Sequence, residues 1–136
     1  MSFDMCKEML GKTFDSVAHI NDDNGNGDQL VFTSTDGTKY VFYHSQDCCE
    51  SVWVEDIAGD LHDLEGSPLL MSETVDGEIP VDEYGHDSIT WTFYKFSTIK
   101  GYVTVRWCGT SNGYYSENVD EQIILPDGAI KNWYNS

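Results

Sequence analysis

Two β-rich runs within ITWTFYKFSTIKGYVTVRWCGTSNGYY (Ile89–Tyr115) decide the fold. Both are rich in aromatic and β-branched residues, and Lys100-Gly101 joins them as a two-residue turn, so the stretch predicts a β-hairpin. Pairing the residues outward from this turn places aromatic and β-branched side chains together on one face, which we expect to be the core face. The predicted core pairs are Tyr94/Trp107, Phe96/Val105 and Thr98/Val103.

The same pairing places Lys95 directly opposite Arg106 on the other face of the hairpin. Two adjacent cations destabilise a strand pair unless an anion or a carboxylate lies between them. Two interpretations stay open. Protein carboxylates, with Glu73 and Glu117 as candidates, could compensate the charges, or the cations could bind an anion or a phosphate-bearing ligand. The candidate ligand site consists of Lys95, Arg106, Trp91 and Tyr115.

The composition predicts a single folded domain over residues 1–136. Hydrophobic residues make up 40% of the chain, which is enough for one core at this length. No apolar run approaches the roughly 20 residues that span a bilayer, and the N-terminus lacks the basic region of a signal peptide. We therefore expect a cytoplasmic protein whose four cysteines are reduced thiols.

The rest of the chain alternates short apolar runs with turn signals. A helix is expected over Ser2–Lys12, and Asp36-Gly37 predicts a second hairpin in which Phe32 pairs with Val41. Asn21–Asp28 is predicted to be a loop, and Ala58–Pro68 at most a helical turn. Further strands are expected at Thr13–Ile20, Cys49–Ile57 and Leu69–Val75. The predicted fold class is α+β: a mostly antiparallel, twisted sheet built from hairpins, with a short N-terminal helix.

Charge is the most unusual property of the sequence. Seven Lys and Arg stand against 24 Asp and Glu, which gives a net charge of −17. Such a surface repels phosphate backbones and anionic membranes, so we expect binding neither to duplex nucleic acid nor to membranes. The charge could serve solubility alone, or it could steer a partner that has a basic surface.

The acids are also segregated along the sequence. Between Lys39 and Lys95 there are thirteen Asp and Glu and no Lys or Arg. This segment is either a solvated acidic face or a surface for a basic partner. The residues predicted to bind such a partner are Glu55, Asp56, Asp60, Asp63 and Glu65.

Motifs for metals, cofactors and catalysis are weak. Asp22–Gly27 matches the opening of a calcium loop, but Thr33 stands where a bidentate Glu is required, so a polar hairpin loop is favoured. A zinc set is disfavoured because its candidate ligands lack any ligand-type spacing. Those candidates are His44, Cys48, Cys49, His86 and Cys108. No cofactor is expected, and an enzyme of unknown chemistry stays a third possibility.

Several runs carry a family resemblance: QDCCE (Gln46–Glu50), DIAGDLHDL (Asp56–Leu64), WTFY (Trp91–Tyr94), TVRW (Thr104–Trp107) and SNGYYSE (Ser111–Glu117). They are similar to segments of a family of small bacteriophage proteins that is catalogued as a domain of unknown function. The resemblance implies a phage accessory protein that acts in the cytoplasm of a bacterial host. It favours an inhibitor of a host defence or DNA-handling protein, whose carboxylates stand in for DNA phosphates. The alternative is a protein that binds or sequesters a nucleotide or another anion.

Overall fold

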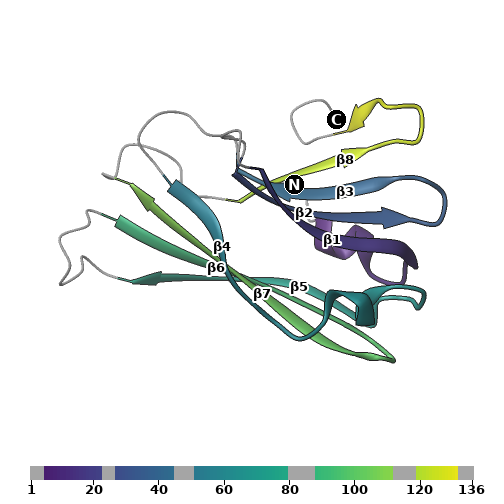
Figure 1. Cartoon of the computed structure of the whole chain (residues 1–136), viewed down its shortest axis with the longest axis horizontal. Coiled ribbons are helices and arrows are strands. Elements are labelled where there is room, and N and C mark those ends of the chain that lie inside the picture. Colours follow the sequence, from purple (N-terminus) through teal and green to yellow (C-terminus); the bar gives the residue numbers. More distant parts are fainter. Residues whose placement is uncertain (1–4, 23–26, 45–50, 80–87, 112–118, 132–136) are drawn as a thin grey trace.

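Two antiparallel sheets packed face to face make up the protein, which we describe from a computed structural model (Figure 1). The description covers residues 5–22, 27–44, 51–79, 88–111 and 119–131. The five-stranded sheet has the order β1 (Phe14–Asp22), β2 (Gly27–Ser34), β3 (Lys39–Tyr43), β8 (Asp120–Ile124) and β9 (Ile130–Lys131). The four-stranded sheet has the order β4 (Ser51–Ala58), β7 (Gly101–Ser111), β6 (Ser88–Thr98) and β5 (Met71–Ile79).

The N-terminal helix ends earlier than the predicted Lys12, and its predicted start at residues 2–4 lies outside the described residues. The helix α1 (Met5–Met9) ends before Gly11, whose φ of 84° is a conformation that glycine adopts readily. A 3₁₀ turn, η1 (Leu61–Leu64), lies in the segment predicted to be a helical turn at most, which confirms that prediction. The mostly antiparallel sheet is therefore confirmed, whereas the α+β class is corrected to mainly β.

The core lies between the two sheets and is largely aromatic. The ring centroids of Phe32 and Phe96 are 4.8 Å apart, and those of Phe42 and Tyr94 are 4.5 Å apart. Each pair joins one sheet to the other, and such pairs contribute about 0.5–1.5 kcal/mol beyond the burial of their area. The residues predicted to be buried are all buried: Phe32, Val41, Tyr94, Phe96, Val105 and Trp107.

The β6–β7 hairpin has the predicted faces but not the predicted register. Its two-residue turn is Ile99-Lys100 rather than Lys100-Gly101, because Thr98 pairs with Gly101. Every predicted pair is thus shifted by two residues, which leaves each side chain on its expected face. Gly101 is needed for a different reason: a Cβ there would lie 2.7 Å from Asp63 Oδ2, so η1 approaches this backbone closely.

The β2–β3 hairpin turns through three residues instead of two. Ser34 N–H donates to Thr38 O at 2.8 Å, so Thr35, Asp36 and Gly37 form the loop. Gly37 has a φ of 94°, as expected where a three-residue loop ends in the left-handed region. Phe32 consequently pairs with Tyr40 rather than with Val41.

The segment predicted as a loop at Asn21–Asp28 instead lengthens two strands. β1 continues to Asp22 and β2 starts at Gly27, while residues 23–26 lie outside the described part of the chain. The side chain of Asp28 is buried and explains this extension. Its Oδ1 accepts from Asn21 Nδ2 at 2.6 Å, and its Oδ2 accepts from Val54 N–H of β4 at 2.7 Å. A buried carboxylate thus ties the two sheets together at one end.

Candidate functional site

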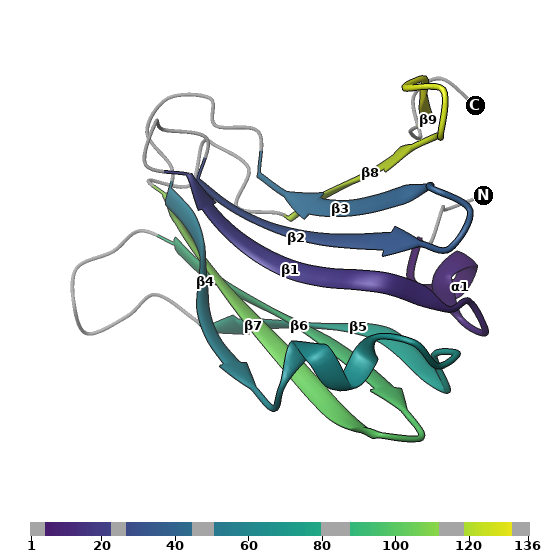
Figure 2. The same cartoon turned by 45° about the vertical axis from the view of Figure 1, so that its right-hand side comes forward.

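The five acids predicted to bind a partner all lie on β4 and on the η1 segment that follows it; we call this set the acidic rim (Glu55, Asp56, Asp60, Asp63 and Glu65). A register shift between Val54 and Asp56 against β7 makes Glu55 the extra residue of a β-bulge. Bulges re-aim side chains at sheet edges, where binding residues are common. The structure therefore brings the five residues into one continuous segment at the edge of the four-stranded sheet (Figure 2).

Asp60 and Asp63 position η1 as well as carrying charge. The Asp60 carboxylate accepts the His62 N–H at 2.9 Å and so caps the 3₁₀ turn. The backbone oxygen of Asp63 accepts from the Thr98 hydroxyl, and its carboxylate lies against Gly101. Asp56 differs from both: it is exposed, and its carboxylate has no hydrogen bond or ion pair to the described residues.

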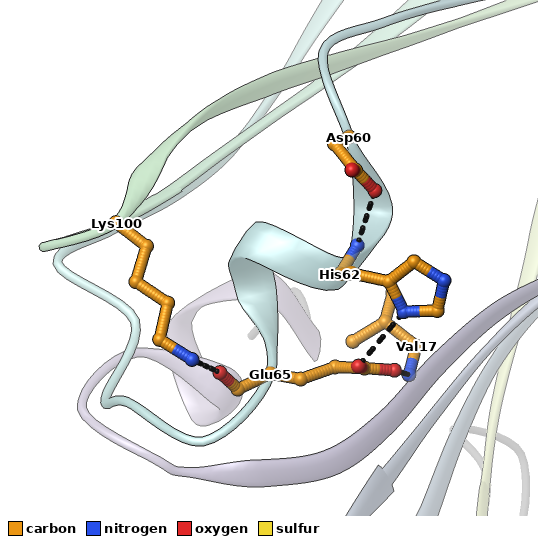
Figure 3. A network of polar contacts seen from close by, with 5 residues as sticks. All are labelled: Val17, Asp60, His62, Glu65 and Lys100. Atoms are coloured by element: carbon orange, nitrogen blue, oxygen red, sulfur yellow. Dashed lines mark hydrogen bonds and ion pairs between the residues drawn. The ribbon is translucent and has the colours of Figure 1, made fainter.

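Glu65 is committed to internal contacts (Figure 3). Its Oε2 accepts from the Val17 N–H of β1 at 2.9 Å, and its Oε1 lies 2.9 Å from His62 Nδ1. Lys100 Nζ donates to the Glu65 backbone oxygen at 2.7 Å. The hydrogen bond from His62, followed by that from Val17, lowers the pKa of the Glu65 carboxyl. The same hydrogen bond raises the pKa of His62. Glu65 therefore fastens η1 to β1 and contributes little free charge for a partner.

The predicted ligand site lies on the outer face of the four-stranded sheet, but its geometry is not the predicted one. Arg106 pairs with Phe93, and Lys95 pairs with Thr104, so the two cations are not directly opposite each other. The two-residue shift in register explains the difference. Lys95 also pairs with Glu73 of β5, one of the two carboxylates predicted to compensate it. Tyr115 and Glu117 lie outside the described residues.

Arg106 is held by an aromatic ring and a carboxylate. Its guanidinium carbon lies 5.2 Å from the centre of the Trp91 ring, a cation–π contact. Its Nη2 lies 3.5 Å from Glu55 Oε1, and Trp53 Nε1 donates to Glu55 Oε2 at 3.3 Å. Two buried nitrogens here, Arg106 Nε and Trp91 Nε1, have no hydrogen-bond partner among the described residues. We call Trp53, Trp91 and Arg106 the aromatic face.

Sequence reasoning missed Glu55 as the ion-pair partner of Arg106, and it missed Trp53 as a hydrogen-bond donor to Glu55. The alternation of SVWVED placed Trp53 on the face opposite Val52 and Val54, but the bulge that turns Glu55 toward Arg106 leaves no mark in the sequence. The tie from Asp28 to β4 was missed for a similar reason. It joins residues that are distant along the chain through a backbone N–H, which no side-chain pattern reveals.

A groove is lined by β1 on one side and by the end of β4 with η1 on the other. Figure 2 shows how these elements are arranged. Its volume is about 580 Å³. Val17, Ala18 and His19 of β1 form one wall, and the segment from Ile57 to His62 contributes the other. His19 Nε2 lies 3.0 Å from Asp28 Oδ1 beside this groove. The groove is thus lined by apolar side chains at Val17, Ile57 and Leu61 and by polar side chains at His19, Asp60 and His62.

Within the described residues, no cluster of three or more His, Cys, Asp or Glu could hold a metal ion. The Asp22–Gly27 motif, for which the sequence favours a polar hairpin loop over a calcium site, falls mainly on residues 23–26, outside the description. Of the disfavoured zinc candidates, Cys48, Cys49 and His86 also lie outside it. Cys6 and Cys108 are buried, and Cys6 Sγ lies 3.2 Å from Thr74 Oγ1. None of the helices in the described part is long and apolar enough to span a membrane.

Fold and site together define a mainly β, two-sheet protein with an acidic rim and an aromatic face. The chain belongs to a family described as Domain of unknown function (DUF7448), which matches residues 7–121 and so most of the 136-residue chain. The resemblance to a family of unknown function is thereby confirmed. No curated protein and no solved structure matches the chain.

Proposed function

We propose that the protein binds a partner protein with a basic surface through the acidic rim. The observation that carries this proposal is the exposure of Asp56 and Asp60 at a sheet edge, in a stretch where no Lys or Arg occurs between Lys39 and Lys95. Glu55 adds a third exposed carboxylate, although Arg106 partly neutralises it. A one-sign field of this kind steers a partner of opposite charge and excludes partners of the same charge.

The proposal extends to the role of the partner. A small, acidic protein of phage type would bind a host defence or DNA-handling protein inside the bacterial cell and inhibit it. The rim carboxylates would occupy the groove in which that protein holds DNA phosphates. This extension is supported by the charge and by the resemblance to phage proteins, which is an argument by analogy.

The test is capture of bacterial lysate proteins on the immobilised protein, with the captured proteins identified and quantified by mass spectrometry. The rim variant carries Asp56→Lys together with Asp60→Asn, since Asn keeps the oxygen that caps η1. We expect it to lower the capture of a basic partner by at least roughly fivefold, the equivalent of about 1 kcal/mol. The loss should grow as the salt concentration falls.

The matched control compares two single variants, Glu8→Lys and Asp56→Lys, because each changes the net charge by +2. Glu8 is an exposed acid of α1, outside the acidic rim. Capture should survive Glu8→Lys and fall with Asp56→Lys. Equal capture by these two single variants, or capture that does not respond to salt, would contradict the proposal.

A second candidate function is the binding of a nucleotide or another phosphate-bearing anion at the aromatic face. It is favoured by the Arg106 guanidinium, which lies over Trp91 and whose Nε has no hydrogen-bond partner in the part of the chain that the structure describes. Arg offers a planar fork to phosphate, and Trp rings can stack on a base. The ion pair with Glu55 acts against this function, because it already compensates the charge.

Arg106→Ala separates the two roles of this residue. If Arg106 serves the fold, the variant should lower the melting temperature of the protein without any added ligand. If Arg106 binds phosphate, the variant should abolish thermal stabilisation by ATP or inorganic phosphate and leave the unliganded melting temperature nearly unchanged. Arg106→Lys is the control, since it keeps the charge and removes the fork. Absence of any stabilisation of the wild type by these anions would reject the second function.

A further inference from the structure

We infer that the free edge of β1 accepts an extended, basic segment of the partner protein as an added β-strand. The inference deepens the proposed function, on which it relies for the charge of the partner. It names the part of the molecule where backbone contact is made, and the conformation that the partner adopts there.

The outward backbone groups of β1 follow from its pairing. β1 is the first strand of the five-stranded sheet and pairs only with β2 among the described strands. The Val17 N–H points away from β2, because it donates to Glu65 Oε2. Backbone groups alternate in direction along an antiparallel strand, so the N–H and C=O groups of His19 and Asn21 also point outward. No hydrogen bond occupies them within the described residues.

Other parts of the β1 and β4 edges are protected against pairing with a further strand, but the part of β1 that follows Val17 is not. Phe14 O accepts from the Gly66 N–H, and Thr13 bridges to Pro68, so the segment after η1 covers the first part of β1. The edge of β4 is interrupted by its bulge, and its Val54 N–H is bound by Asp28. Proteins usually block an open edge with Lys, Pro, a bulge or a covering segment. Among the described residues, the stretch from Ala18 to Asn21 has none of these, whereas the outward Val17 N–H is already bound by the Glu65 carboxylate.

The space beside this edge suits an added strand. The groove of about 580 Å³ runs between Val17–His19 and the end of β4 with η1, so a strand paired to β1 would lie within it. Ile57 and Leu61 form an apolar wall opposite β1. In strand addition, main-chain hydrogen bonds supply affinity, and such wall residues select the alternate side chains of the incoming segment.

The charge of the groove favours a basic segment as its occupant. Asp60 lines the groove, and among the described lining residues there is no Lys or Arg. Basic side chains on the incoming strand would therefore meet the Asp60 carboxylate on the groove wall. A second copy of this chain is a poor occupant, since each copy carries a net charge of −17.

The experiment titrates isotope-labelled full-length protein with an alternating Lys-Val peptide of about ten residues, while NMR follows amide hydrogen exchange. We expect the His19 and Asn21 amides to become protected on binding, whereas a Glu-Val peptide of the same length should have no effect. His19→Pro removes the outward donor without breaking a bond to β2. His19→Ala is the matched control: it loses the same contact with Asp28 but keeps the N–H.

His19→Ala should bind the Lys-Val peptide about as well as the wild type. His19→Pro should bind it at least roughly tenfold more weakly, since a ladder hydrogen bond is lost and the ring obstructs the strand. If both variants bind equally, or the two amides stay unprotected in the wild-type complex, strand addition is rejected while the acidic-rim function stands. Failure of the peptide to bind at millimolar concentration, or self-association through β1, also rejects the inference. Loss of the Asp56→Lys effect on capture would instead reject the proposed function.

Discussion

Glu65 shows how one carboxylate of a highly acidic chain can serve the fold rather than a partner. Its two oxygens are bound by a backbone N–H of β1 and by His62, and its backbone oxygen is bound by Lys100. Hydrogen bonds to the charged form of a carboxyl lower its pKa, as found here. Asp36 behaves likewise in the β2–β3 turn, where the Ser34 hydroxyl and then the Thr38 N–H lower its pKa to about 2. Neither role is visible in a count of acids.

The contact of His62 with Glu65 predicts a pH-dependent contribution to stability. The pKa of His62 is raised by folding, so its contribution is fully present below the pKa of an unfolded histidine, roughly 6.5, and is lost as the pH rises through the folded value. The pKa of Glu65 is lowered, so its contribution is present above the unfolded value and is lost in acid. The pair therefore stabilises the protein most in weakly acidic solution.

We expect His62→Ala to lower the free energy of unfolding in this weakly acidic window and to have little effect well above neutral pH. Urea denaturation across the pH range measures the difference between variant and wild type. In a Glu65→Gln background the His62 substitution should lose its pH dependence, which makes the double-mutant cycle the control. An effect of His62→Ala that is constant with pH would show that the imidazole acts through packing and not through its charge.

At the scale of elements, the sequence predicts faces more securely than registers. Alternation in the β6–β7 hairpin placed Tyr94, Phe96 and Trp107 in the core, and all three are buried. The predicted turn position is wrong because local patterns assign Gly101 to the turn. A glycine is needed at this position because Asp63 of η1 packs closely against the backbone, and no local pattern contains this tertiary contact. The Asp36-Gly37 prediction located its hairpin and missed only the additional loop residue.

The candidate site, like the hairpins, could be predicted from the sequence only in part. The acids of the rim could be selected from the sequence because they occur in one uninterrupted stretch without cations. Their different roles could not be predicted. Only the folded chain distinguishes Asp56, which is exposed and unbound among the described residues, from Glu65, whose carboxylate is bound. The free edge of β1 was likewise unpredictable, because strand order depends on which segments cover which edges.

At the scale of the whole molecule, the two cations nearest the acidic rim are engaged in internal contacts while rim carboxylates stay exposed. Arg106 is bound to Glu55 and Trp91, and Lys100 to the backbone of Glu65. Asp56 and Asp60 stay exposed at the sheet edge. The acidic rim thus offers a partner exposed carboxylates, and this favours electrostatic recognition that is sensitive to salt.

The proposed imitation of DNA phosphates makes a prediction about competition. The protein itself should not bind duplex DNA, because a net charge of −17 repels the phosphate backbone. A partner whose basic groove is occupied by the acidic rim should release the protein when a short DNA duplex is added, since both ligands neutralise the same cations.

We expect release from the captured complex to rise with duplex concentration. A gel shift of the protein alone with the duplex at low salt should show no complex. Retention of the partner at saturating duplex would place the rim contact outside any DNA groove. A micromolar shift of the protein alone would contradict the electrostatic argument itself.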